Sequence, residues 1–129
     1  PTTTGAASAL GLVIPELEGK LDGLAVRVPT PTVSLLDLTV ELEKSATVQT
    51  INEAFKQASQ GKLKGILEYT EMPLVSTDYR GSEFSAVLDG LLTMTMGDRM
   101  TKVIAWYDNE WGYSVRVVDM VAFIASQGL

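Results

Sequence analysis

The sequence predicts an α+β fold: a mostly antiparallel, mixed sheet with about three helices packed on one face. Three observations predict it. Residues 36–43 alternate between apolar and polar side chains, which is typical of a strand buried on one face only. Residues 47–60 carry apolar side chains at helical spacing. The expected order is helix, two strands, helix, four strands and helix, which differs from the strict strand–helix alternation of a doubly wound sheet.

Length and composition indicate one globular domain over residues 1–129. The chain is 46% hydrophobic and 20% charged, and its net charge of −6 comes from interspersed acids and bases. Without a basic stripe, a nucleic-acid partner is not expected. The apolar runs are too short to span a membrane. The chain contains no cysteine and no histidine, which excludes a thiolate metal site, a thiol nucleophile and an imidazole base within it.

The first third of the chain predicts one helix and two strands. The helix begins after the N-cap candidates Thr3 and Thr4 and ends or kinks at Pro15. The apolar side chains of residues 24–28 alternate, which predicts a strand that Pro29 ends. The second strand covers residues 36–43, with its leucines and valine on one face and its acids and threonine on the other.

The rest of the chain predicts two helices and four short strands. A helix over 47–60 is stopped by Gly61, and a final helix runs from about 110 to 127. Asp108 and Asn109 are the N-cap candidates of that last helix. Its expected inward side chains are Val117, Val121 and Ile124, and the expected strands are 66–70, 85–89, 91–96 and 100–107.

Three groups of residues are candidate ligand contacts, and each has a structural alternative. Thr4 and Gly5 open a helix whose free N–H groups favour phosphate, although spacing alone favours ordinary N-capping. Arg27 precedes a stretch stiffened by two prolines and can hold an anion, or it can be a solvated arginine. Asn109 can bind a carboxamide through its own amide, or it can cap the helix.

The ordered set TTTGAA, LAVRVPTPTVSLLDL, LKGIL and VIAWYDNEWGYSVRVVD resembles the second half of phosphorylating glyceraldehyde-3-phosphate dehydrogenases. The resemblance covers essentially the whole chain, and WYDNEWGYS and RVPTP carry it most specifically. Erythrose-4-phosphate dehydrogenases are a close relative that shares these motifs. The resemblance implies that this chain is a truncated C-terminal catalytic domain of that enzyme. It also implies that the whole enzyme is a glycolytic homotetramer that uses NAD or NADP. The implied location is the cytoplasm, with an organelle as the alternative.

The resemblance also implies roles for five residues. Thr4 and Gly5 correspond to positions that bind phosphate near the attacking inorganic phosphate, and Arg27 to the arginine that reaches the sugar-phosphate substrate. Asn109 corresponds to the residue that hydrogen-bonds the nicotinamide carboxamide, and Tyr113 to an aromatic side chain near the nicotinamide ring. No catalytic residue and no metal ligand is expected in this chain.

The family's nucleophilic cysteine, its activating histidine and its dinucleotide-binding half are absent from this sequence. We therefore expect a fragment that is inactive alone and acts with the missing N-terminal half. One alternative hypothesis is a non-catalytic folding or assembly module that associates through its sheet face. Another is a fragment of an erythrose-4-phosphate dehydrogenase.

Overall fold

The computed structural model describes residues 1–128, with the side chains of residues 7 and 8 left out. The chain divides into two compact units, Pro1–Pro31 and Thr32–Leu129. Each unit is described by itself below. The prediction of a single domain over 1–129 stays a prediction.

The first unit contains helix α1, Ala6–Val13, followed by a 3-10 turn over Pro15–Leu17. Pro15 ends the helix as predicted, because its ring cannot continue the helical hydrogen bonding. The strand expected over 24–28 is wrong. Only Ala25 is bridged, by an antiparallel pair of hydrogen bonds with Thr2, whose N···O distances are 2.8 and 3.0 Å. No longer strand lies beside this segment among the described residues of the unit, so its valines stay exposed.

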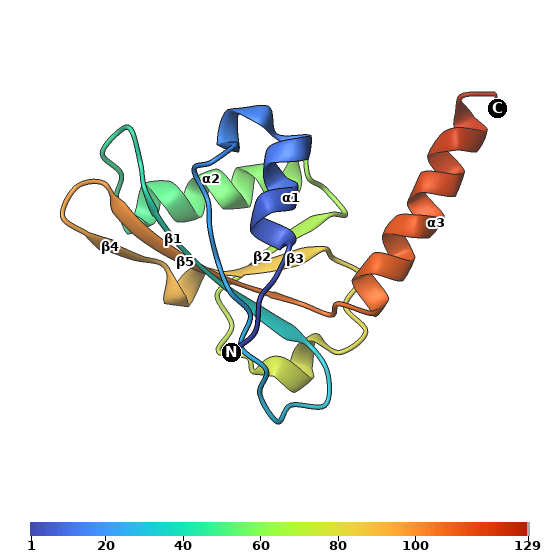
Figure 1. Ribbon diagram of the computed structural model, residues 1–129, viewed down its shortest axis with the longest axis horizontal. Coiled ribbons are helices and arrows are strands. Elements are labelled where there is room, and N and C mark those ends of the chain that lie inside the picture. The colour runs from blue at the N-terminus through green and yellow to red at the C-terminus, as the bar shows by residue number, and fades with distance from the viewer. Residues whose placement is uncertain (129) are drawn as a thin grey trace. The chain divides into compact units, whose positions relative to one another are not determined.

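The second unit is built on a five-stranded sheet centred on β5, Met100–Tyr107 (Figure 1). β1, Ser34–Glu41, pairs antiparallel with β5 along its whole length. The other edge of β5 pairs antiparallel with β4, Met94–Met96, and with β3, Ala86–Asp89. β2, Leu67–Thr70, lies parallel to β3 at the sheet edge. The mixed, mostly antiparallel sheet and the α+β class are therefore confirmed.

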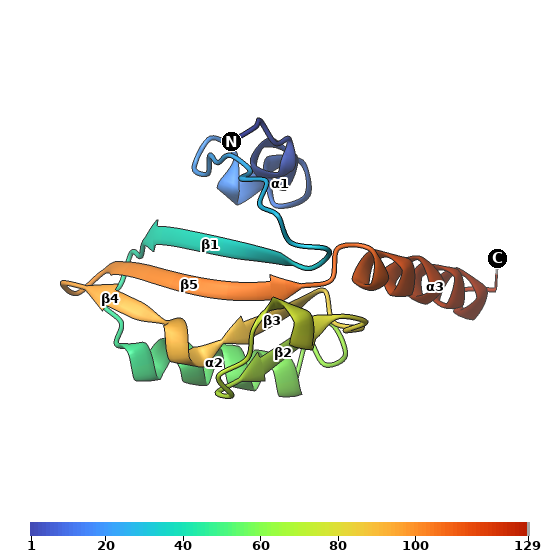
Figure 2. The same ribbon diagram turned by 90° about the horizontal axis from the view of Figure 1, so that it is seen from below.

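Helix α2, Val48–Gln60, covers one face of this sheet (Figure 2). Thr47 and Thr50 form a capping box: each side-chain oxygen accepts from the other residue's backbone N–H, at 3.2 and 2.9 Å. Ile51 is buried with Leu88, Val103 and Ala105, and Phe55 packs beside them. The predicted helix is confirmed, and its apolar stripe forms the core together with the sheet.

The expected strand over 91–96 is shorter in the structure, because residues Gly90–Leu92 form a 3-10 turn. Asp89 caps this turn by accepting from the N–H of Leu91 at 3.1 Å. Gly90 lies so close to the ring of Tyr69 that a Cβ at this position would overlap the ring.

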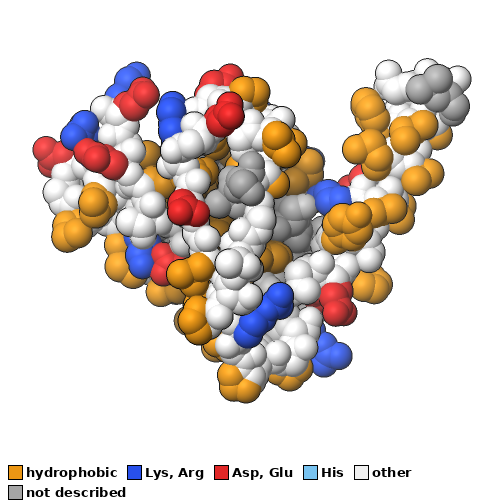
Figure 3. Space-filling view, viewed as in Figure 1, with side chains coloured by type: hydrophobic (Ala, Val, Ile, Leu, Met, Phe, Trp, Pro, Cys, Tyr) orange, Lys and Arg blue, Asp and Glu red, His pale blue; other side chains and the backbone are white. Residues whose placement is uncertain are grey.

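Helix α3, Trp111–Ser126, leaves the end of β5 and extends away from the sheet (Figure 1). The expectation that Val117, Val121 and Ile124 point inward is wrong, because all three side chains are exposed. The helix is anchored through its first turns, and apolar side chains gather along the rest of it (Figure 3). Within residues 1–128, no helix is long and apolar enough to cross a membrane.

Candidate functional site

A hollow of about 300 Å³ lies where β5 ends and α3 begins. The last residue of β5, the two residues after it and the first two turns of α3 supply most of its wall. Its lining residues are Ser85, Tyr107, Asp108, Asn109, Gly112, Tyr113 and Arg116. The structure thus brings together the two residues expected to contact a nicotinamide, Asn109 and Tyr113.

Asp108 is the capping side chain of α3. Its Oδ1 accepts hydrogen bonds from the N–H groups of Glu110 and Trp111 at 3.1 and 3.0 Å, and its Oδ2 accepts from Gly81 at 2.9 Å. The residue is only 6% exposed. These backbone donors, the one from Gly81 foremost, lower the pKa of the Asp108 carboxyl despite its burial. Asp108 therefore fixes the start of the helix as a buried, charged group.

Asn109 does not cap the helix, so the structural alternative for this residue is wrong. Its Oδ1 accepts a hydrogen bond from the hydroxyl of Ser34 at 3.1 Å. Its side chain is exposed, and its Nδ2 donates to no other described residue. One end of the amide is thus held by the protein, while the other remains a donor for a ligand.

Gly112 and Arg116 hold the first two turns of α3 against the segments just before β3 and β2. A side chain at Gly112 would bring its Cβ within 3.1 Å of the backbone oxygen of Phe84, so only glycine fits comfortably there. The Arg116 guanidinium donates to the carbonyl of Gly65 at 3.1 Å and pairs with Asp119 at 2.7 Å. These contacts set the position of the hollow's helical wall.

The aromatic residues of WYDNEWGY separate into packing and exposed groups. Trp106 stacks on Tyr79 and donates its indole N–H to Asp89 at 3.3 Å. Trp111 is half exposed, and Tyr113 is 72% exposed. Trp106 therefore serves packing, whereas the ring of Tyr113 is available at the hollow.

The expected phosphate residues lie in the first unit. Thr4 accepts a hydrogen bond from the N–H of Ala6 at 3.2 Å, so its hydroxyl oxygen stabilises the first turn of α1. Gly5 precedes the helix with φ −85°. The N-cap position is Gly5, so the prediction of Thr3 or Thr4 as the N-cap is wrong, although the Thr4 hydroxyl still bonds the first turn. A phosphate contact of Thr4 stays a prediction.

Arg27 lies two residues after the bridged Ala25, whereas Thr4 lies two residues after the bridged Thr2. The bridge is antiparallel, so these two segments leave it in opposite directions. Arg27 is exposed, and no hydrogen bond or ion pair joins its guanidinium to another described residue. The side chain is thus unengaged within residues 1–128.

Gly112, Arg116 and Ser34 belong to the site or its support, but the sequence patterns did not select them. Asp108 was predicted as an N-cap candidate, and its side chain does cap the helix. Among the unselected residues, only Gly112 carried a signal, because it lies in the same DNEWG motif as Asn109. In the described part of the chain, no three acidic, histidine or cysteine side chains are grouped so as to hold a metal ion. The site's chemistry is that of amide, aromatic and guanidinium groups.

Comparison with known proteins identifies the same family over most of the chain. The family model described as "Glyceraldehyde 3-phosphate dehydrogenase, C-terminal domain" matches residues 1–109. The glyceraldehyde-3-phosphate dehydrogenase of Geobacillus stearothermophilus is 61% identical over 129 residues, which is all of this chain and 38% of that protein. Glyceraldehyde-3-phosphate dehydrogenase 2 of Bacillus subtilis is 59% identical over 98% of this chain and 37% of its own length. The chloroplastic enzyme GAPB of Arabidopsis thaliana is 56% identical over 98% of the chain and 29% of its own length.

Proposed function

Because the chain belongs to the glyceraldehyde 3-phosphate dehydrogenase family through that family's C-terminal domain, we propose that it works as part of such a dehydrogenase. The chain spans about 38% of the length of the Geobacillus relative. The proposed activity is the NAD(P)-dependent oxidation of an aldehyde coupled to its phosphorylation. The observation that carries the proposal is the joint presence of the Asn109 amide and the Tyr113 ring in one hollow.

The hollow suits the nicotinamide end of a dinucleotide. Asn109 offers a carboxamide oxygen an Nδ2 donor that no other described residue engages, and Tyr113 offers an exposed ring in the same hollow. When bound, the nicotinamide supplies the hydride acceptor. The role of this chain is to hold and orient that ring through Asn109 and Tyr113. Whether NAD or NADP is preferred depends on residues outside these contacts.

The phosphate contacts are proposed for the first unit. Arg27 is an exposed guanidinium that pairs with none of the described residues, which suits the phosphate of a sugar phosphate. Thr4 and Gly5 lie at the start of α1, where the positive end of the helix dipole favours inorganic phosphate. With no cysteine and no histidine, the chain supplies neither the thiolate that would attack the aldehyde nor the imidazole that would activate it. Those groups must come from the remainder of the enzyme.

The test joins this chain to the complementary portion of the Geobacillus relative and follows NADH formation from glyceraldehyde 3-phosphate, NAD and phosphate. Turnover is expected only when both portions are present. A joined protein that folds, as shown by a cooperative unfolding transition, but gives no NADH would refute the proposal. Replacing the substrate by erythrose 4-phosphate tests the related activity. The names of the relatives support glyceraldehyde 3-phosphate.

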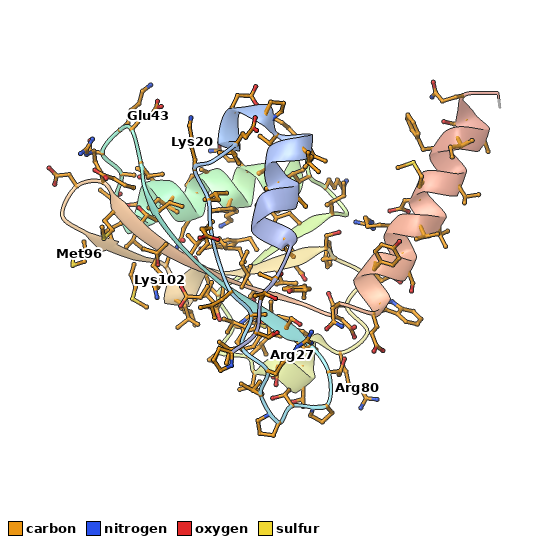
Figure 4. All side chains as sticks on the ribbon, in the orientation of Figure 1. Lys20, Arg27, Glu43, Arg80, Met96 and Lys102 are labelled. Atoms are coloured by element: carbon orange, nitrogen blue, oxygen red, sulfur yellow. The ribbon has the colours of Figure 1, made fainter. Side chains whose placement is uncertain are left out.

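Arg27→Ala tests the phosphate contact in the joined protein. Loss of a charge-assisted, bidentate contact should raise the KM for the sugar phosphate about tenfold or more. Lys20→Ala is the matched control, because Lys20 is another exposed cation of the same unit (Figure 4). Equal effects of the two substitutions would show that net charge, and not a specific contact, is responsible.

A homotetramer assembled through the sheet face away from α2 is also proposed. Alternation along the strands directs Asp37 and Lys102 to that face, opposite the core residues Leu38 and Val103. The ion pair Asp37–Lys102, at 2.8 Å, lies there beside exposed methionines, of which Met96 is near the β4–β5 turn (Figure 4). Such a mixture of apolar and paired polar groups resembles a subunit interface.

Light scattering on the joined protein tests this assembly, and Leu35→Asp on the same face should shift it towards smaller species. A wild-type protein that stays monomeric at high concentration would rule the assembly out. Association of the chain without any turnover after joining would instead favour the alternative of a non-catalytic assembly module. The proposed location is the cytoplasm, with an organelle as the alternative that the chloroplastic relative illustrates.

A further inference from the structure

Ser34 and Asn109 lie 75 residues apart in the sequence, yet their side chains form a hydrogen bond of 3.1 Å. The sheet register explains the contact. Ser34 is the first residue of β1 and stands opposite Tyr107, the last residue of β5. Asn109 follows two residues later, where the chain turns into α3 (Figure 2). The start of one strand thus meets the end of its neighbour at the hollow.

The direction of this hydrogen bond determines which end of the Asn109 amide faces a ligand. A serine hydroxyl can donate to the amide oxygen, and here it does so to Oδ1. With Oδ1 engaged, the amide presents Nδ2, a donor. A freely rotating asparagine would instead present oxygen and nitrogen in turn and would pay rotamer entropy on binding.

The backbone around Ser34 is also fixed in an unusual way. Val33 has φ 74°, the only positive φ among the non-glycine residues that the structure describes. A β-branched residue adopts this conformation rarely, because its Cβ approaches the neighbouring carbonyl. The turn into β1 is therefore specific, and it delivers the Ser34 hydroxyl to Asn109.

We propose that Ser34 is a positioning residue of the cofactor site, which holds the Asn109 amide with Nδ2 directed at the carboxamide oxygen of the nicotinamide. This inference rests on the proposed function. Ser34 itself contacts no ligand in this scheme. It acts through Asn109, so its removal should weaken only the part of cofactor binding that the nicotinamide contributes.

The experiment measures Kd for NAD and for ADP-ribose, which lacks the nicotinamide, with the chain joined to the complementary portion of the Geobacillus relative. Ser34→Ala should weaken NAD binding about fivefold, the equivalent of one ordinary hydrogen bond. The same variant should leave ADP-ribose binding unchanged. Ser34→Thr keeps a hydroxyl and should restore NAD binding to near the wild-type value.

Two further variants make the test specific. Thr39→Ala removes another exposed hydroxyl of β1 that has no hydrogen-bond partner among residues 1–128, and it should change neither Kd. Asn109→Ala should weaken NAD binding, and adding Ser34→Ala to it should have no further effect, because the two residues act as one unit.

Equal weakening of NAD and ADP-ribose by Ser34→Ala would mean a structural role and would overturn the inference. So would an unchanged NAD affinity in Ser34→Ala when Asn109→Ala weakens it. If Asn109→Ala itself leaves the ratio of the two Kd values unchanged, the proposed nicotinamide contact is wrong, and the inference falls with it. The failure of the inference alone is thereby distinguished from failure of the proposed function.

Discussion

The phenol ring of Tyr79 is stacked on the indole of Trp106, with ring centroids 5.4 Å apart and planes inclined by 12°. Tyr79 is 4% exposed and belongs to the 3-10 turn Ser76–Tyr79. Two residues farther on, Gly81 donates to Asp108 at 2.9 Å. One short turn is therefore attached both to the end of β5 and to the cap of α3.

Truncation of Tyr79 should destabilise the second unit strongly. Tyr79→Ala removes a buried ring and its stacking on Trp106, which we expect to cost about 3–5 kcal/mol of unfolding free energy. Tyr79→Phe is the matched control. The Tyr79 hydroxyl is buried without a hydrogen-bond partner among the described residues, so its removal should leave stability unchanged or slightly higher. Urea unfolding followed by tryptophan fluorescence measures the stability of both variants. A large loss of stability in Tyr79→Phe would contradict the claim that the ring, and not the hydroxyl, stabilises the fold.

Gly90 should not tolerate a side chain. A Cβ at this position would overlap the Tyr69 ring and its hydroxyl. We expect Gly90→Ala to cost about 1–3 kcal/mol, the usual range for overpacking. Gly23→Ala is the control, because no atom lies within 4 Å of the added Cβ there. Thermal unfolding of both variants checks the prediction, and equal midpoints would show that Tyr69 moves aside at little cost.

Asp108 should contribute to the acid sensitivity of the protein. Its pKa is lowered in the fold, chiefly by the hydrogen bond from Gly81, so the folded state binds its proton less readily than the unfolded chain does. The resulting stability is fully present above the unfolded value of 3.8 and is lost as pH falls through the folded pKa. Asp108→Asn should cost about 2 kcal/mol near neutral pH.

The difference between wild type and Asp108→Asn should then shrink below about pH 4. Urea unfolding at several pH values measures it. Asp98→Asn, which removes an exposed carboxylate, should change stability by less than about 0.5 kcal/mol at any of these pH values. A wild-type advantage over Asp108→Asn that persists unchanged into strong acid would contradict the assignment.

Tyr69 should make the stability of the protein fall in alkali, whereas Asp108 makes it fall in acid. Burial, and then the hydrogen bond of its hydroxyl to Glu71 at 2.6 Å, raise the pKa of Tyr69 from 10.0 to about 12. The unfolded chain therefore loses the proton first, and stability falls as pH rises from about 10 towards 12. Tyr69→Phe should show a shallower decline in that interval. Parallel curves for the two proteins, recorded by circular dichroism, would refute this.

Local patterns were sufficient for the elements that carry their own signals. The stripe of Ile51 and Phe55 and the stop at Gly61 predicted α2, because each acts within one or two turns of the helix. The cap at Thr47 was recognised only in the structure. The long strand β5 was predicted equally well. The prediction of a strand over 24–28 was wrong. Alternating side chains indicate that a segment can form a strand, but they do not show that another strand lies beside it.

The site was predicted in part. Spacing left Asn109 open between a helix cap and a ligand contact, and the structure excluded the cap by giving that task to Asp108. Ser34 was not selected at all, since nothing near residue 34 indicates a partner near residue 109. The prediction that one face of α3 packs inward was also wrong. The spacing of apolar side chains shows that a helix has an apolar face, but it does not show which part of the protein covers that face.

The sequence by itself determined the family, the α+β class, the helix α2 and the residue types available for chemistry. These depend on composition and on contacts between residues close in the chain. The tertiary structure alone decided that β1 starts where β5 ends, and thereby that the Ser34 hydroxyl meets the Asn109 amide. Strand register is a property of two distant segments together, and the free energy that selects it comes from packing across the whole sheet.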